Sequence, residues 1–201
     1  MQKLDFTYAS KNEHNIAQRF IIKIIENLSG KRKLEQLYKN YSNLDRDPIN
    51  FWSDIIEIMK INVINKSEGK LIIPKDGPLM IISNHPYGII DGIILCSMVS
   101  KFRSDFKIMT HETLQLIPEL KDFILPIDFS KPTRETSKKN IETSKAAKEH
   151  LINKGAIIIF PAGSVSIAKN IATEAYDDEW KLFPAKLIQQ TKANVLPVFF
   201  D

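Results

Sequence analysis

Short apolar runs alternate with helix-length segments through most of the chain, and this alternation limits the folds that the sequence allows. The runs lie at residues 79–82, 106–109, 124–127 and 155–160, with helical patterns between them at 89–102, 118–122 and 134–153. Runs that are apolar at nearly every position are typical of strands covered on both faces, and strands that alternate with helices favour parallel pairing. The sequence therefore predicts an α/β fold: an αβα sandwich with a mixed, mainly parallel sheet, preceded by N-terminal helices.

Residues 1–60 are expected to form the N-terminal helical segment, and residues 61–201 the α/β domain. Apolar residues recur at helical spacing over 16–28, and the basic cluster at 31–33 precedes a second helical pattern over 34–41. An apolar helix face followed by basic residues suits a membrane surface, although any helix that packs on a core shows the same face. A third helix follows Asp47-Pro48, and two strands are predicted at 61–64 and 70–73.

Composition narrows the classes of protein. The chain has 201 residues, of which 43% are hydrophobic and 26% charged, as is typical of a globular protein. The formal net charge of +4 favours anionic partners, but the lysines are scattered and no nucleic-acid-binding motif occurs, so nucleic acid is not expected. No apolar stretch approaches the ~18 to 20 residues needed to cross a bilayer. With no secretory signal at its start, the protein is expected to be cytoplasmic.

The sequence offers little support for thiol or metal chemistry. Cys96 lies within an apolar run, where it is expected to pack as a small hydrophobic residue. A role for Cys96 as nucleophile is the alternative, but no basic residue stands beside it. His14, His111 and His150 show no metal-ligand spacing, so no metal site is predicted.

The strand at 79–82 leads into a segment that carries a histidine and a carboxylate. The segment runs Asn-His-Pro-Tyr-Gly-Ile-Ile-Asp-Gly over residues 84–92, with His85 and Asp91 a short loop apart. A neutral imidazole can act as general base, and a neighbouring carboxylate can orient it. The alternative is a structural histidine and a first-turn acid that complements the helix dipole. The position favours function, because α/β sheets build their sites at the carboxyl ends of strands.

A second polar segment follows the strand at 155–160. It runs Pro-Ala-Gly-Ser-Val-Ser over residues 161–166. Proline, glycine and serine are also the expected residues of an ordinary turn, so this segment alone does not decide between a binding loop and a turn.

Together these segments, with Trp180 and the apolar run at 194–200, resemble the glycerolipid acyltransferase superfamily, which acylates lysophosphatidic acid and other lysolipids. The resemblance extends from about His85 to the end and is greatest for the haemolysin-like, ornithine-lipid branch. It implies that His85 and Asp91 are catalytic, as base and orienter. It also implies that substrate is bound by Asn84, Pro86, Gly88, Phe160, Pro161, Gly163, Ser164 and Ser166. Because related enzymes continue beyond the strand that contains Pro197, we expect the domain to lack its C-terminal part.

Two departures from the mainstream pattern bear on activity and substrate. One extra residue separates His85 from Asp91, and we expect the conformational freedom of Gly88 to restore their contact. Ala162 and Val165 replace the glutamate and arginine that help to hold a glycerol phosphate in that family. Unless Lys169, Lys186 or backbone amides substitute for them, the acceptor is expected to lack a phosphomonoester, as lyso-ornithine lipid does.

The resemblance implies acyl transfer from an acyl carrier protein or coenzyme A thioester to a lysolipid hydroxyl, with no bound cofactor. The acceptor's own hydroxyl would attack, and the enzyme would lie peripherally on the inner face of the membrane. Arg134 or Lys138 could contact the donor, although a solvated helix face explains them equally well. Two alternatives remain: a hydrolase with Ser83 or Ser164 as nucleophile, and a lipid-binding domain without catalysis.

Overall fold

The computed structural model describes residue 41 and residues 46–66, 72–128, 133–168 and 175–201. Contacts divide the chain into two compact units, residues 1–47 and 48–201, and each is described by itself. The helix predicted at 16–28 and the basic cluster at 31–33 lie outside the described residues, as does the helix at 34–41 except for Tyr41, which is helical. No helix in the described part of the chain combines the length and hydropathy needed to cross a bilayer.

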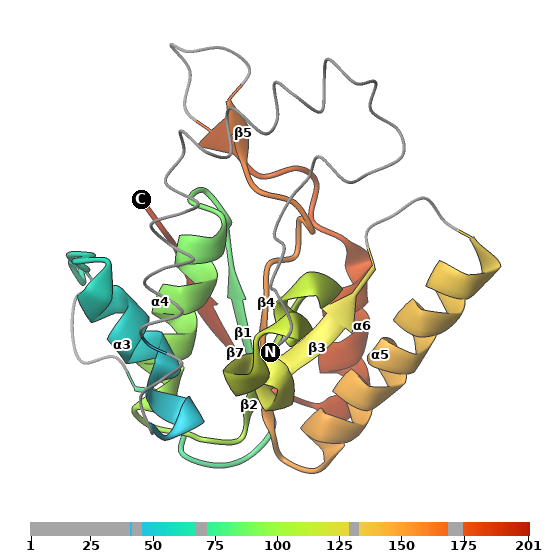
Figure 1. Ribbon diagram of the computed structural model, residues 1–201. Helices are drawn as coiled ribbons and strands as arrows, with labels where there is room; N and C mark the ends of the chain where they lie inside the picture. The colour runs from blue at the N-terminus through green and yellow to red at the C-terminus, as the bar shows by residue number, and fades with distance from the viewer. Residues whose placement is uncertain (1–40, 42–45, 67–71, 129–132, 169–174) are drawn as a thin grey trace. The chain divides into compact units, whose positions relative to one another are not determined.

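The second unit is built around a five-stranded sheet (Figure 1). Its strands are β1 (Leu79–Ser83), β2 (Phe106–His111), β3 (Ile124–Ile127), β4 (Ala156–Ile159) and β7 (Asn194–Val198). They lie in the order β3-β2-β4-β1-β7, and every pair is parallel. All four residues of β4 are buried, as their unbroken apolar sequence predicts for a strand covered on both faces. The mainly parallel sheet that the sequence predicts is confirmed, and none of the described pairs in these five strands is antiparallel.

Helices cover both faces of this sheet (Figure 1). The principal ones are α3 (Phe51–Ile58), α4 (Ile89–Ser100), α5 (Arg134–Ile152) and α6 (Leu182–Thr191). On one face, Met109 of β2 belongs to a core cluster with Leu151 of α5 and Leu187 of α6. Its neighbour Ile108 points to the other face and lies beside Gly92 of α4. The αβα sandwich is therefore confirmed, and α3 packs on the outer side of α4.

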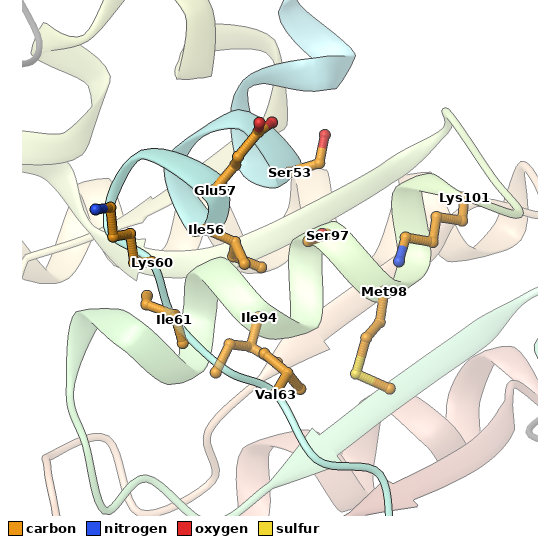
Figure 2. A pocket seen from close by; sticks show the side chains of 10 residues that line it. All are labelled: Ser53, Ile56, Glu57, Lys60, Ile61, Val63, Ile94, Ser97, Met98 and Lys101. Atoms are coloured by element: carbon orange, nitrogen blue, oxygen red, sulfur yellow. The ribbon is translucent and has the colours of Figure 1, made fainter.

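The strands predicted at 61–64 and 70–73 are wrong where the structure describes them. Residues 61–64, 72 and 73 belong to no strand, and residues 70 and 71 lie outside the described residues. Ile61 and Val63 instead line a groove of about 320 Å³ between α3 and α4, with Ile94 and Met98 on α4 (Figure 2). Ile64 and Ile72 are exposed, and the described backbone of these runs stays unpaired with the sheet.

Short elements complete the unit. They are the 3-10 helices η2 (Pro48–Asn50), η3 (Glu112–Leu116) and η4 (Pro118–Phe123), and the antiparallel hairpin of β5 (Ile167–Ala168) with β6 (Ala175–Tyr176). Helix α3 was predicted within the N-terminal segment, whereas its contacts place it in the second unit. Antiparallel pairing among the described strands is confined to the hairpin, which lies beyond the carboxyl ends of β1 and β4 (Figure 1).

Candidate active site

The two segments singled out in the sequence leave the sheet side by side. Strands β1 and β4 are neighbours, with Ile82 paired to Ile159, so the loops that follow them begin at the same edge. Residues 84–88 connect β1 to α4, and residues 160–166 connect β4 to the hairpin. The carboxyl edge of a parallel sheet is where α/β proteins place their ligands. Segments about 75 residues apart in sequence (85 and 160) therefore meet at one place.

His85 and Asp91 are in contact across the first of these loops. The Nδ1 atom of His85 lies 3.0 Å from Oδ2 of Asp91. The Asp91 side chain is fully buried, whereas that of His85 keeps 17% exposure. The carboxylate can accept only if Nδ1 carries the proton, which leaves the Nε2 lone pair as the base. The predicted contact is confirmed, and the arrangement suits proton abstraction from an alcohol.

Further hydrogen bonding fixes the Asp91 carboxylate. The same Oδ2 accepts the backbone N–H of Tyr87 at 2.9 Å, while Oδ1 is buried without a hydrogen-bond partner among the described residues. Asp91 lies in the first turn of α4, where the helix dipole favours a negative charge. Its charge is thus compensated through His85, one amide and the helix end, which holds the carboxylate toward the imidazole.

Gly88 permits this contact despite the extra residue in the loop. It immediately precedes α4 with φ 66° and ψ −129°, a conformation that residues with a Cβ atom rarely adopt. Its carbonyl oxygen accepts the N–H of Asp91 at 3.1 Å, which begins the helix. The chain therefore turns sharply enough to bring Asp91 back to His85, as the glycine predicted.

The second loop packs on the histidine. The ring of Phe160 stacks on the His85 imidazole, with centroids 3.9 Å apart and planes at 17°. The Ser166 N–H donates to the carbonyl oxygen of His85 at 2.8 Å. Val165 lies next to Gly88: a Cβ built on that glycine would be 3.6 Å from Val165 Cγ2. The second loop therefore contacts the first at both its histidine and its glycine.

Asp177 is a functional candidate that the sequence predictions did not include. Its Oδ1 accepts the backbone N–H of His85 at 3.0 Å and also the hydroxyl of Ser166. Its Oδ2 accepts the indole N–H of Trp180 at 2.8 Å. One carboxylate thus joins the histidine loop, the second loop and the segment before α6. The signal in the sequence was its position three residues before Trp180, within a short acidic run.

The remaining predicted binding residues serve several different contacts. Asn84 bonds to the backbone of Phe200 in both directions, donating from Nδ2 at 2.8 Å and accepting at Oδ1 at 2.7 Å. Ser164 donates to Asp178 at 3.2 Å, and the N–H of Gly163 donates to the Phe160 carbonyl. Pro86 is half-buried and Pro161 buried within their loops. These residues shape the loops, and their roles toward substrate stay predictions.

Other reactive groups lie apart from the histidine. Cys96 is buried in the middle of α4, and burial raises the pKa of its thiol well above the ordinary value, which disfavours the nucleophilic thiolate. His150 hydrogen-bonds the carbonyl oxygens of Asp105 and Ala156 near the start of β4. No group of three metal-binding side chains occurs within the described ranges. The groove between α3 and α4 includes none of the predicted site residues in its lining.

Comparison with known proteins shows which family the chain resembles. Relatives named lyso-glycine lipid O-acyltransferase occur in Phocaeicola vulgatus, at 25% identity over 203 residues, and Bacteroides thetaiotaomicron, at 26% over 187. The matches cover 100% and 81% of this chain but 68% and 65% of those proteins, so the chain spans about two thirds of their length. No solved structure matches it. A family model described as Acyltransferase matches residues 64–201, which include both loops and Asp177, and the chain therefore belongs to the acyltransferase family.

Proposed function

We propose that the protein transfers a fatty acyl group from a thioester to a hydroxyl of a lysolipid, with His85 as general base. The observation that carries the proposal is the 3.0 Å contact between His85 Nδ1 and the buried Asp91 carboxylate, at the carboxyl edge of the sheet. Membership of the acyltransferase family and the similarity to two lyso-glycine lipid O-acyltransferases support the class of reaction.

The chemistry follows from the position of the proton on His85. Nε2 takes the proton of the acceptor hydroxyl as its oxygen attacks the thioester carbonyl carbon. A C–O bond forms, the C–S bond breaks, and the imidazolium returns its proton to the departing thiolate. Asp91 keeps Nδ1 protonated and steadies the imidazolium throughout. The N–H groups of Gly163 and Ser166 already donate to carbonyl oxygens within the protein. Substrate binding by backbone amides near Gly163 therefore stays a prediction.

The proposed acceptor is a lysolipid with an amino-acid headgroup, such as lyso-glycine lipid or lyso-ornithine lipid, in preference to lysophosphatidic acid. Val165 offers no cation where the mainstream family pattern has arginine, and Ala162 is buried in the glutamate position. A phosphomonoester carries up to two negative charges and is best held by a guanidinium. Of the two lysines considered as substitutes, Lys169 lies outside the described residues, and Lys186 is exposed on α6.

The proposed donor is an acyl carrier protein or coenzyme A thioester, and the mechanism requires no bound cofactor. Arg134 and Lys138 support this, because both are exposed in the first turns of α5, which begins on the carboxyl side of β3. Two cations at this edge suit the phosphates of a phosphopantetheine donor. Since the acceptor is a lipid, we propose that the enzyme works at the inner face of the cytoplasmic membrane.

The contacts weigh against the two alternative functions. A serine hydrolase needs a hydroxyl bonded to its histidine, but the hydroxyls of Ser83 and Ser164 donate to Asn84 and Asp178. A lipid-binding domain without catalysis is the better interpretation if Ala162, Val165 and the longer spacing between His85 and Asp91 have disabled the chemistry, and the spacing is the reason that concerns the base itself. The close contact of these two residues removes that reason.

The test is acyl transfer by the whole protein, with both thioester donors and with lyso-glycine lipid, lyso-ornithine lipid and lysophosphatidic acid as acceptors. We expect transfer to the amino-acid lysolipids, and a loss of kcat of about 10²–10⁴-fold in His85→Ala, because the base is removed. His111→Ala is the control, since His111 ends β2 at the same edge and is not required. Near-normal turnover by His85→Ala, with its fold verified by circular dichroism, would refute the mechanism, and preference for lysophosphatidic acid would refute the acceptor.

A further inference from the structure

Six exposed apolar side chains belong to segments that adjoin the two loops of the candidate active site. Tyr87, Ile89, Ile167, Tyr176, Leu182 and Phe199 are each between 55% and 78% exposed. They come from the histidine loop and the start of α4, from both strands of the hairpin, from the start of α6, and from the end of β7. We refer to these six residues as the apolar rim. Single exposed apolar residues are ordinary on a protein surface, whereas a cluster calls for an explanation.

Contacts within the site place these segments next to His85. Ile167 and Tyr176 are paired across the hairpin, and Ser166, directly before Ile167, donates its N–H to His85. Lys181, directly before Leu182, donates its N–H to the Pro161 carbonyl at 3.0 Å. Phe200, directly after Phe199, bonds to Asn84. The hairpin lies beyond the carboxyl edge of the sheet (Figure 1), so the segments that carry the rim adjoin the edge where His85 lies.

The composition of the rim is that of a protein surface in contact with a lipid interface. Five aromatic side chains among the described residues are exposed. Three of them belong to the rim, and a fourth, Trp180, lies beside Asp177 close to it. The fifth is Phe102. Tyrosine and tryptophan favour the headgroup region of bilayers, where an apolar ring and a polar atom are both satisfied.

The charges near the rim do not favour an acidic partner. Lys66 is paired with Asp201 at 2.6 Å, and Lys181 stands among Asp178 and Glu179, both exposed. A surface that binds acidic acyl carrier protein would need an excess of cations, which the described part of the rim does not have. Its apolar side chains are therefore better suited to insertion among lipids than to an acidic protein.

We propose that the apolar rim is a membrane-docking surface. It holds the edge of the sheet that carries His85 against the lipid interface. A lysolipid then reaches His85 without its acyl chain crossing water. The inference deepens the proposed function and rests on it for the acceptor, but the docking itself depends only on the rim. It concerns a surface different from the N-terminal helix predicted at 16–28.

The test is sedimentation of the whole protein with vesicles of phosphatidylethanolamine and phosphatidylglycerol. We expect Ile167→Ser combined with Leu182→Ser to lower the partition coefficient at least about tenfold. The matched control is Ile141→Ser combined with Ile152→Ser, because both isoleucines are similarly exposed on α5. Leu182→Ser combined with Phe199→Ser leaves the hairpin intact and should also weaken binding. Melting temperatures establish that each variant is folded.

Two further measurements separate this proposal from the others. Because the rim acts by insertion, the ratio of wild-type to variant binding should be the same at about 50 mM and 500 mM salt, although surface charge attraction is screened at the higher concentration. The rim variants should lose acyl transfer to lysolipid in vesicles but keep transfer to a short-chain lysolipid dissolved as monomers.

Four results would overturn the proposal. The rim variants could bind vesicles as the wild type does, or the α5 control could lose as much vesicle binding as they do. The difference in binding between wild type and variants could disappear in high salt, or the variants could lose binding of acyl carrier protein with vesicle binding intact. Failure of the proposed function is recognised differently. In that case the wild type would transfer no acyl group to any acceptor, while the vesicle results would still decide whether the rim docks.

Discussion

At the scale of the residue, the candidate site depends on a short segment whose spacing can be read directly from the sequence. His85, Gly88 and Asp91 lie within seven consecutive residues, so local geometry alone decides whether the imidazole meets the carboxylate. Gly88 adopts φ 66°, and Asp91 consequently turns back to His85. Because these interactions are local, the sequence was sufficient to predict both residues and the role of the glycine between them.

Replacing Gly88 with alanine tests this local geometry. We expect Gly88→Ala to lose about 1–3 kcal/mol of unfolding free energy, because a Cβ atom makes the native φ and ψ unfavourable. It should also lower kcat, because relaxation of the loop moves Asp91 away from His85. Denaturant unfolding and steady-state acyl transfer measure the two effects.

Gly77→Ala is the matched control for that substitution. Gly77 also has a positive φ, of 83°, and a Cβ atom there meets nothing within 4 Å, but it lies in the turn before β1, at the opposite edge of the sheet. A similar loss of stability with unchanged kcat is expected. If the two alanine variants lower kcat equally, the conformation of Gly88 is not what holds Asp91 against His85.

At the scale of the element, the hairpin β5–β6 and the segment after it hold the two loops of the site together. Asp177 directly follows β6, and its carboxylate bonds to His85, Ser166 and Trp180. His85 and Asp177 are 92 residues apart, so no local spacing reveals their contact. The sequence therefore predicted the histidine and the serine but missed the carboxylate that joins them.

Asp177 is a positioning residue, and Asp177→Asn tests that role. The amide retains one acceptor oxygen but places an NH₂ group toward one of the present donors, so at least one hydrogen bond is lost. We expect kcat to fall by up to about 10²-fold, because small displacements of a catalytic group are costly. The KM for the acceptor should change much less. Steady-state kinetics with a monomeric short-chain lysolipid separate the two constants.

The neighbouring carboxylate supplies the control. Asp178 is exposed, and its carboxylate accepts the Ser164 hydroxyl at 3.2 Å. Asp178→Asn should leave kcat nearly unchanged. The contrary result is that Asp177→Asn lowers KM and kcat together and Asp178→Asn lowers both by the same amounts. The acidic run would then act through its charge and not through the contacts of one residue.

At the scale of the whole α/β unit, the apolar runs predicted at 79–82, 106–109, 124–127 and 155–160 each coincide with a strand of the sheet, at its edge as well as in its interior. β1 and β4 have unbroken apolar sequences and neighbours on either side. The run at 61–64 contains Asn62 and is largely exposed, with Ile61 and Val63 lining the groove beside α3 and α4, so a short apolar run alone does not establish pairing in a sheet. Helix α6 and the hairpin were not predicted, because their apolar patterns are short or interrupted.

The order of the strands could not be predicted from the sequence either, although this order brings the two loops of the site together. The order β3-β2-β4-β1-β7 places β4 beside β1 and so brings Phe160 against His85. Nothing in the local pattern of either strand specifies this neighbour. That both loops lie on the same edge follows from parallel pairing alone, because each loop follows the carboxyl end of its strand.

The most direct measurement is a double-mutant cycle on kcat with His85→Gln, Asp91→Asn and the combined variant, under saturating thioester and a monomeric lysolipid. If Asp91 acts only by orienting and stabilising the imidazole, it contributes nothing once His85 is gone. The combined variant should then be no slower than His85→Gln alone, although Asp91→Asn by itself is strongly impaired. Losses that multiply, or a His85→Gln enzyme with wild-type kcat, would contradict the account.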